Sequence, residues 1–280
     1  MSSKVLVVDN DFFFVEFLSD LLTGRGYDVV KAYDGKQAIE RLESDSFDLV
    51  FLDIVMPKID GERVVKYVRA RFPDIRFPIV ALSGSIIERL DELGIIGADY
   101  YIAKGPMDRM EAEIVRFLDE FEVSGLTFGA VGETHRFFEQ KHLYPRQETA
   151  EMMEAVEFQK SIIESLAHGV IVLDRDTRLI HANSAALHVF GLGIEDLLNR
   201  PFMSLFVQGE RPLLVESLKA LVTGGVRGGY RMTASTATAR VRLYMSLLKV
   251  GAETAGWVVV VEEETDGYRH QPAERNSQQR

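Results

Sequence analysis

The stretch FDLVFLDIVMPKIDGERVV, residues 47–65, decides the fold of the first half of the chain. Its apolar run Leu49–Leu52 is short and continuous, as is typical of a parallel strand buried on both faces. The run stops at the carboxylate of Asp53, and a helical period begins at Gly61. The stretch therefore predicts a strand–helix unit whose strand ends in an acidic residue.

The same alternation of a short apolar run and a helical period occurs five times in the first 122 residues. The apolar runs are Val5–Val8, Val29–Val30, Leu49–Leu52, Ile79–Leu82 and Tyr100–Ala103. The helical periods are Phe14–Leu22, Gly35–Glu43, Gly61–Phe72, Ile86–Gly94 and Met107–Glu122. Five such units predict an α/β fold, a doubly wound five-stranded parallel sheet that binds its ligand at the carboxyl ends of the strands.

Polar side chains stand where four of these strands end. Asp9 and Asn10 follow the first strand, Asp53 the third, Ser83 the fourth and Lys104 the fifth. Because parallel strands end at one edge, we expect these groups to converge on one pocket. Clustered carboxylates suit Mg²⁺, and a carboxylate can also attack a phosphoryl group to give an aspartyl phosphate. An ammonium group would then neutralise the phosphoryl oxygens.

The motifs VLVVDND, FDLVFLDIVMPKIDGERVV, PIVALSGS and GADYYIAKGP, in this order, resemble the CheY-like receiver domain of response regulators. The resemblance covers residues 1–122 and implies a role in two-component signalling. It implies that Asp53 is the phosphoacceptor of a partner histidine kinase or phosphotransfer protein, with Ser83 and Lys104 binding the phosphoryl group. It also implies that Tyr101 changes rotamer between states. The implied metal ligands are Asp9, Asn10, Asp53 and the Val55 carbonyl.

Two departures from the receiver pattern bear on its chemistry. The family usually has an acid where this chain has Asn10, so the Mg²⁺ site is expected to be weaker. The lysine is usually followed directly by a cis-proline, whereas Gly105 intervenes between Lys104 and Pro106. A degenerate, unphosphorylated receiver–PAS scaffold therefore remains an alternative. A magnesium-dependent phosphatase is disfavoured, because Val55 stands where such enzymes carry a general acid.

The second half begins with less regular sequence. Residues 123–146 are predicted to be a linker, 147–168 a signalling helix, 169–264 an α+β domain and 265–280 a disordered tail. In the helix, six residues spaced three and four apart form a two-helix seam: Thr149, Met152, Val156, Gln159, Ile163 and Leu166. The seam predicts a homodimer; a single amphipathic helix lying on a domain is the alternative.

The stretch from Ile162 to Phe206 contains the turn Asp174–Asp176, the run Asn183–Ala186 and the pair Phe190-Gly191, and it resembles a PAS domain. That resemblance implies a five-stranded antiparallel sheet with helices on one face. A haem-binding PAS domain would carry its ligand histidine on the helix Arg211–Val222. This helix has no histidine, so haem is not expected. His181 and His188 are interpreted as strand-end and helix-surface residues. An empty PAS domain used for dimerisation is favoured, and any ligand stays unknown.

Composition sets the remaining limits. The 280 residues suit two domains, no apolar run is long enough to span a bilayer, and there are no cysteines, which excludes a cysteinyl-flavin adduct. The net charge of −11, concentrated before residue 123, disfavours nucleic acid. We expect a cytoplasmic, non-enzymatic response regulator with Mg²⁺ as cofactor and an unknown downstream protein. Phosphorylation is expected to reach the PAS domain through Met107–Glu122 and the linker.

Overall fold

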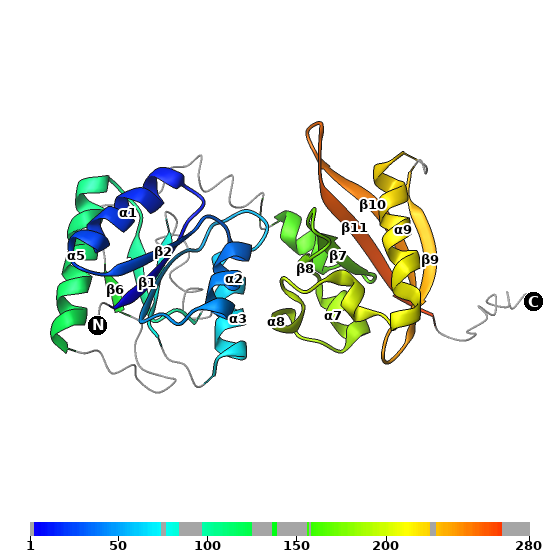
Figure 1. Ribbon diagram of the computed structural model, residues 1–280, viewed down its shortest axis with the longest axis horizontal. Coiled ribbons are helices and arrows are strands. Elements are labelled where there is room, and N and C mark those ends of the chain that lie inside the picture. Colours follow the sequence, from blue (N-terminus) through cyan, green and yellow to red (C-terminus); the bar gives the residue numbers. More distant parts are fainter. Residues whose placement is uncertain are drawn as a thin grey trace, which may run out of the picture.

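The computed structural model describes residues 3–73, 77–83, 97–124, 136–138, 156, 158–224 and 228–264. These residues form two sheets of different type, each with its own helices (Figure 1). The helix expected at Ile86–Gly94, the first half of the signalling helix and the tail lie outside the described residues.

The first sheet has the strand order β2-β1-β3-β4-β5-β6, with every neighbouring pair parallel. Its strands are β1 (Lys4–Val8), β2 (Asp28–Ala32), β3 (Leu49–Asp53), β4 (Ile79–Ser83), β5 (Tyr100–Ala103) and β6 (Arg136–Phe138). The described helices of this domain are α1 (Phe12–Gly24), α2 (Gly35–Ser44), α3 (Gly61–Arg71) and α5 (Met107–Ser124). The predicted doubly wound α/β fold is confirmed.

All five predicted strands are present, and a sixth extends the sheet at one edge. This strand, β6, comes from the expected linker and pairs with β5, Tyr101 lying opposite Phe137. Pairing with an edge strand satisfies backbone groups that would otherwise be left open at the end of the sheet. A strand of three residues is too short to show a pattern in the sequence, which is why only scattered phenylalanines were visible there.

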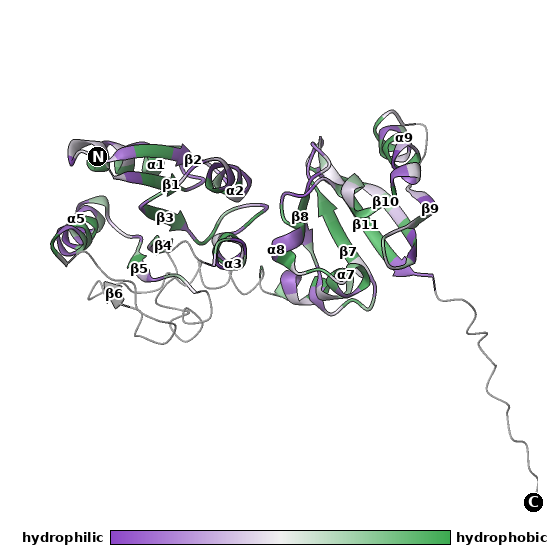
Figure 2. Ribbon diagram, turned by 60° about the horizontal axis from the view of Figure 1, so that its bottom comes forward, coloured by the Kyte–Doolittle hydropathy of each residue, from purple (hydrophilic) through white to green (hydrophobic). Residues whose placement is uncertain are grey.

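Helices cover both faces of the parallel sheet. Alternate strand residues face α1 and α5 on one side, as Phe51 does, and α2 and α3 on the other, as Leu52 does. Every residue of β3 and β4 is buried, and the strands stand out as hydrophobic in Figure 2. The core therefore lies in two layers, and the polar strand ends are left at the edge.

Short acidic caps fix where the helices begin. The Asp11 carboxylate accepts from the backbone N–H of Phe13 at 2.9 Å and starts α1. Asp34 caps α2 and Asp60 caps α3 in the same way, through hydrogen bonds of 2.8 and 2.9 Å. Such caps are worth about 1 kcal/mol each. They hold the loops that carry the functional side chains.

The second sheet is antiparallel, in the order β8-β7-β11-β10-β9, as predicted. Its strands are β7 (Gly169–Leu173), β8 (Leu179–Ala182), β9 (Tyr230–Ser235), β10 (Arg240–Val250) and β11 (Glu253–Glu263). The helices and turns between β8 and β9 are α7 (Ser184–Phe190), α8 (Ile194–Leu197), η2 (Phe202–Leu205), η3 (Gln208–Glu210) and α9 (Arg211–Val222). They supply Phe202, Leu214 and Leu218 to one core against the sheet.

A buried asparagine ties the helical turns at residues 158–164 to this domain. Asn183 caps α7 and donates through Nδ2 to the carbonyls of Ile163 and His168, both at 3.0 Å. Of the predicted seam, Val156 and Leu166 are exposed and Ile163 is half-buried. Thr149 and Met152 lie outside the described residues, so the homodimer stays a prediction.

Candidate functional site

Two carboxylates and one ammonium meet at the carboxyl edge of the parallel sheet. The Lys104 Nζ lies 2.5 Å from Oδ2 of Asp9 and 3.1 Å from Oδ2 of Asp53. Both acids are buried, with exposed fractions of 0% and 4%. Ser83, also buried, ends the neighbouring strand β4, and its carbonyl accepts from the Lys104 backbone N–H at 2.8 Å. The convergence predicted from the strand ends is thus present.

Local turns aim these side chains. Asp9 Oδ1 accepts from the backbone N–H of Asp11 at 2.9 Å, and Asp53 Oδ1 accepts from that of Val55 at 3.3 Å. The Lys104 ammonium also lies 4.9 Å from the ring centre of Phe14, a favourable cation–π distance. Each carboxylate is therefore oriented by a backbone N–H two residues further along its own loop.

Burial changes the acidity of the central carboxyl. The pKa of Asp53 is raised to about 6, chiefly because burial penalises the charged form. The Lys104 ammonium opposes this rise, whereas the charge of Asp9 adds to it. Two carboxylates therefore share a single cation, and the pocket carries an excess of negative charge.

The donor set of this pocket fits a small divalent cation. Asp9 Oδ2 is buried, and Lys104 approaches it within ion-pair distance but without hydrogen-bond geometry. Asn10 is exposed at the rim, and Asp11 is used as the cap of α1. Among the described residues no three carboxylate or imidazole side chains form a complete metal cluster. A cation would therefore depend on water, backbone and phosphoryl oxygens for its other ligands.

Tyr101 lies inside the domain. Its exposed fraction is 1%, and burial raises its pKa to about 12. It packs in the core layer that faces α2 and α3. The expected change of its rotamer between states stays a prediction, and residues 84–96 lie outside the described residues.

The three phenylalanines that open α1 divide between core and surface. Phe14 is buried, whereas Phe12 and Phe13 are 56% and 80% exposed. Phe12 stacks on Tyr33 with ring centres 5.8 Å apart. Two exposed aromatic rings therefore stand in the first turn of α1, directly after its capping residue Asp11.

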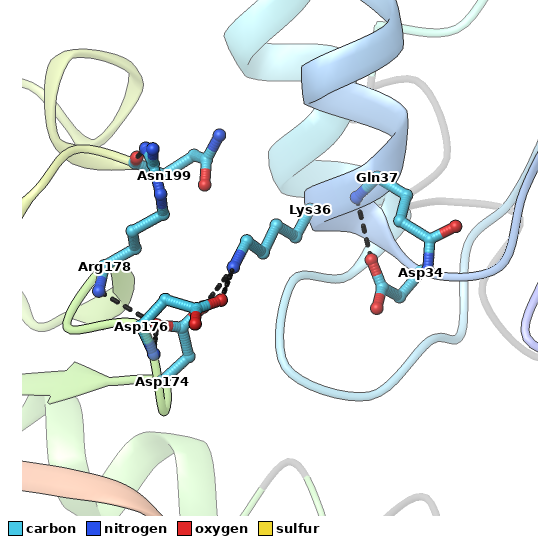
Figure 3. A network of polar contacts seen from close by, with 7 residues as sticks. All are labelled: Asp34, Lys36, Gln37, Asp174, Asp176, Arg178 and Asn199. Carbon is cyan, nitrogen blue, oxygen red and sulfur yellow. Dashed lines mark hydrogen bonds and ion pairs between the residues drawn. The ribbon is translucent and has the colours of Figure 1, made fainter.

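A contact that sequence analysis missed joins the two domains (Figure 3). Lys36, in the first turn of α2, reaches Asp174 and Asp176 of the second domain, both at 2.7 Å. The Asp174 carboxylate also accepts from the backbone N–H groups of Asp176 and Arg178. Lys36 and Asp174 are largely buried, with side-chain exposures of 17% and 8%.

Further contacts extend the interface along α3. Arg63 contacts the Nδ1 atom of His181 in β8, and Lys160 lies 3.7 Å from Glu62. Ile180 and Leu198 of the second domain are 6% and 4% exposed and belong to the core cluster of α2 and α3. The docked face of the first domain is thus the α2–α3 face, and α3 lies beside α8 in both views.

Some signs of this contact were present in the sequence. The Asp174–Asp176 turn is one of the features that resemble a PAS domain, and Ile180 alternates with the inward-facing Leu179. His181 lies in β8 and His188 is exposed on α7, as predicted. The place of His181 against another domain was not foreseen.

Comparison with known proteins agrees with the division into two domains. Residues 5–114 match the family model of the response regulator receiver domain, and residues 157–261 match that of the PAS fold. The chain joins a response-regulator receiver to a PAS domain. The receiver thus supplies the acidic pocket and α2–α3, and the PAS domain supplies Asp174, His181 and α8.

The transcriptional regulatory protein PhoP for alkaline phosphatase synthesis in Bacillus subtilis is 39% identical over 105 residues, 37% of this chain and 43% of PhoP. The response regulator TrrA of Thermotoga maritima, solved with Mg²⁺ and BeF, is 32% identical, with a TM-score of 0.36; the match covers 42% of this chain and 99% of TrrA. A PAS domain from Colwellia psychrerythraea is 11% identical, with a TM-score of 0.35, over 39% of this chain and 96% of that one. The chain spans less than half the length of PhoP.

No helix in the described ranges has both the length and the hydropathy needed to cross a bilayer.

Proposed function

We propose that the chain is a two-component response regulator that accepts a phosphoryl group on Asp53 from a partner histidine kinase or phosphotransfer protein. The observation that carries this proposal is the position of the Lys104 ammonium, which lies within 3.1 Å of a carboxylate oxygen of both Asp9 and Asp53. Ser83 ends a strand at the same edge of the sheet. The proposal places the protein in the cytoplasm, where such kinases present their phosphohistidine.

The proposed reaction is a phosphoryl transfer between two side chains. A carboxylate oxygen of Asp53 attacks the phosphorus, the P–N bond to the donor histidine breaks, and its electron pair returns to the imidazole. The Lys104 ammonium balances charge on the transferred phosphoryl oxygens. The Ser83 hydroxyl donates to one of those oxygens in the product.

Bound Mg²⁺ would supply further neutralisation of the phosphoryl oxygens. Asp9, Asp53, the Val55 carbonyl and the Asn10 amide would hold it. An amide in place of a carboxylate removes one negative charge from the ligand set, so binding is expected to be weaker than in a receiver with paired acids.

We propose a protein-binding output for the PAS domain, without enzymatic activity or contact with nucleic acid. The exposed apolar side chains Val156, Phe158, Ile162 and Leu166 support a homodimer, because they leave hydrophobic surface uncovered in one chain. The PAS ligand and the downstream protein are not assigned.

A second candidate function is a scaffold that is never phosphorylated. Asn10 favours it, since weak Mg²⁺ binding would remove the charge neutralisation that the transfer needs. In that case Lys104 would hold Asp9 and Asp53 permanently, and the PAS domain would recruit partners without a covalent signal.

Acetyl phosphate with MgCl₂, followed by intact-mass measurement, separates the two functions. The full chain should gain one phosphoryl group, Asp53→Asn should gain none, and Asp48→Asn, at an exposed acid, should behave as the wild type. Asn10→Asp should tighten Mg²⁺ binding by about tenfold. Absence of a mass gain in both the wild type and Asn10→Asp at saturating Mg²⁺ would reject phosphoryl transfer and support the unphosphorylated scaffold.

A further inference from the structure

We propose that the α2–α3 face of the receiver is the surface through which Asp53 acts on the PAS domain, and that phosphorylation releases this contact. The inference rests on the proposed function, because it takes Asp53 as the phosphoacceptor. Its structural basis is the loop of residues 54–60, which starts at Asp53 and ends at the docked helix α3.

The C-terminal end of this loop is packed directly against the phosphoacceptor. A Cβ atom on Gly61 would lie 2.3 Å from the backbone oxygen of Asp53, so no side chain fits there. The Gly61 N–H donates to the Ile54 carbonyl at 3.0 Å. The first turn of α3 therefore cannot stay in place if the backbone around Asp53 moves.

The middle of the loop is packed against the helix that carries Lys36. A Cβ atom on Gly35 would lie 2.3 Å from the Ile59 carbonyl oxygen, and Ile59 itself is fully buried. Gly35 directly precedes Lys36, whose ammonium holds Asp174 and Asp176 at 2.7 Å. A shift of Ile59 is consequently passed to the ion pairs with the PAS domain.

Lys58 connects the same loop to the interface a third time. It has a positive φ of 69°, a backbone conformation that is strained for a residue other than glycine. Its carbonyl accepts from Arg63 at 3.4 Å, and its charge acts on Asp176 across the domain boundary. Arg63 in turn contacts His181. The loop conformation at Lys58 is thus linked, through Arg63 and Asp176, to residues that contact or belong to the docked PAS domain.

The direction of the effect follows from what holds the loop now. In the structure the Val55 N–H donates to Oδ1 of Asp53. A phosphoryl group at Asp53 adds charge and three acceptor oxygens that draw N–H groups and cations toward themselves. The loop conformation that suits the unmodified carboxylate is then no longer favoured. Phosphorylation and docking oppose each other, and the group can shift the equilibrium only by this difference in contacts.

A distance measurement in the full chain tests the inference. Because the chain has no cysteine, Glu40→Cys on α2 and Asp196→Cys on α8, both exposed positions, can carry the only two spin labels. The unmodified chain should show one narrow distance distribution. After acetyl phosphate and MgCl₂, with the phosphorylated fraction read by intact mass, the population at longer distances should rise at least fivefold.

Charge variants in the same labelled background test the contact independently of phosphorylation. Lys36→Glu sets three carboxylates together and should separate the domains without phosphoryl transfer; adding Asp176→Lys should restore the short distance. The matched control is Lys31→Glu, at the 2.7 Å pair Lys31–Glu16 within the receiver, which should change nothing.

The outcomes separate the inference from the proposed function. A clear mass gain with an unchanged distance distribution overturns the inference alone, and so does a Lys36→Glu variant that stays docked. Absence of a mass gain refutes the proposed function and removes the inference with it.

Discussion

The two sheets of this molecule are buried in different ways. In the receiver every residue of β3 and β4 is buried, because α1 and α5 cover one face and α2 and α3 the other. The PAS sheet has its own helices on one face only, and β10 accordingly alternates between buried and partly exposed residues. Antiparallel sheets commonly leave one face open in this way.

The open face of the PAS sheet is itself uneven. On β10 the residues between the buried positions are polar, such as Arg242, Tyr244 and Ser246. On β7 and β8 the corresponding residues are Val172 and Ile180, which pack against the receiver cluster. The difference shows where a second domain is needed: the apolar end of the open face marks the docking surface.

The largest effect is expected in the sheet that is covered on both faces. Phe51→Ala removes a fully buried ring from β3 and should lower receiver stability by about 3–5 kcal/mol. The only tryptophan, Trp257, is buried in the PAS core. Circular dichroism should therefore show a large shift of the denaturant transition and Trp257 fluorescence a smaller one. Val123→Ala, at a residue 89% exposed, is the control; equal shifts in both signals would mean that the sheets unfold as one unit.

A smaller effect is expected where one domain covers the sheet of the other. Ile180→Ala on β8 should lower PAS stability by about 2 kcal/mol, since the receiver buries this outward-facing side chain. The measurement is urea unfolding of the full chain followed by Trp257 fluorescence. Val250→Ala, at a residue of β10 that is 68% exposed, should stay within about 0.5 kcal/mol of the wild type. If both variants change the free energy of unfolding equally, the receiver does not bury Ile180 in solution.

The smallest effect concerns pH. Burial, with the nearby Arg63, lowers the pKa of His181 to about 4; Glu164 and Asp60 act in the opposite direction, and Lys160 adds to the lowering. Between about 4 and the ordinary value of 6.5 the unfolded chain then binds more protons than the folded one. His181 should therefore contribute stability that grows as pH rises through this window and is lost as pH falls, by about 1 kcal/mol for a partly exposed ring.

Unfolding curves at several pH values from 4.5 to 7.5 measure this contribution. Relative to the wild type, His181→Asn should lose a contribution to stability that grows as pH rises through this window, whereas His188→Asn, at the exposed histidine on α7, should keep it. An unchanged slope in His181→Asn would place the titrating group elsewhere.

The sequence predicts the acidic pocket well for a geometric reason. Asp9, Asp53, Ser83 and Lys104 each follow an apolar run, and parallel strands bring their ends together whatever the loops do. The contact of Lys36 with Asp174 has no such signal, because the two residues are 138 positions apart and belong to different folding units. Predicting it would require knowing which face of one domain meets which face of the other.

A smaller difference has the same origin. The strand β6 is absent from the prediction because pairing with β5, rather than any local pattern, makes residues 136–138 extended. The expected route from α5 through the linker to the PAS domain stays a prediction, because most of the linker lies outside the described residues. The described residues show a direct contact from α2 and α3, which precede the PAS domain by about a hundred residues.

The strand β6 also has a consequence for how strong the domain contact must be. It anchors the chain at the β5 edge of the receiver, so the PAS domain is tethered to the receiver from this edge. A covalent tether makes docking intramolecular, with an effective concentration on the order of millimolar. Surfaces whose dissociation constant as separate molecules is about a tenth of this concentration would therefore be docked roughly nine-tenths of the time in the intact chain. Such a tethered contact can be released by the modest change in contacts that we propose for a phosphoryl group at Asp53.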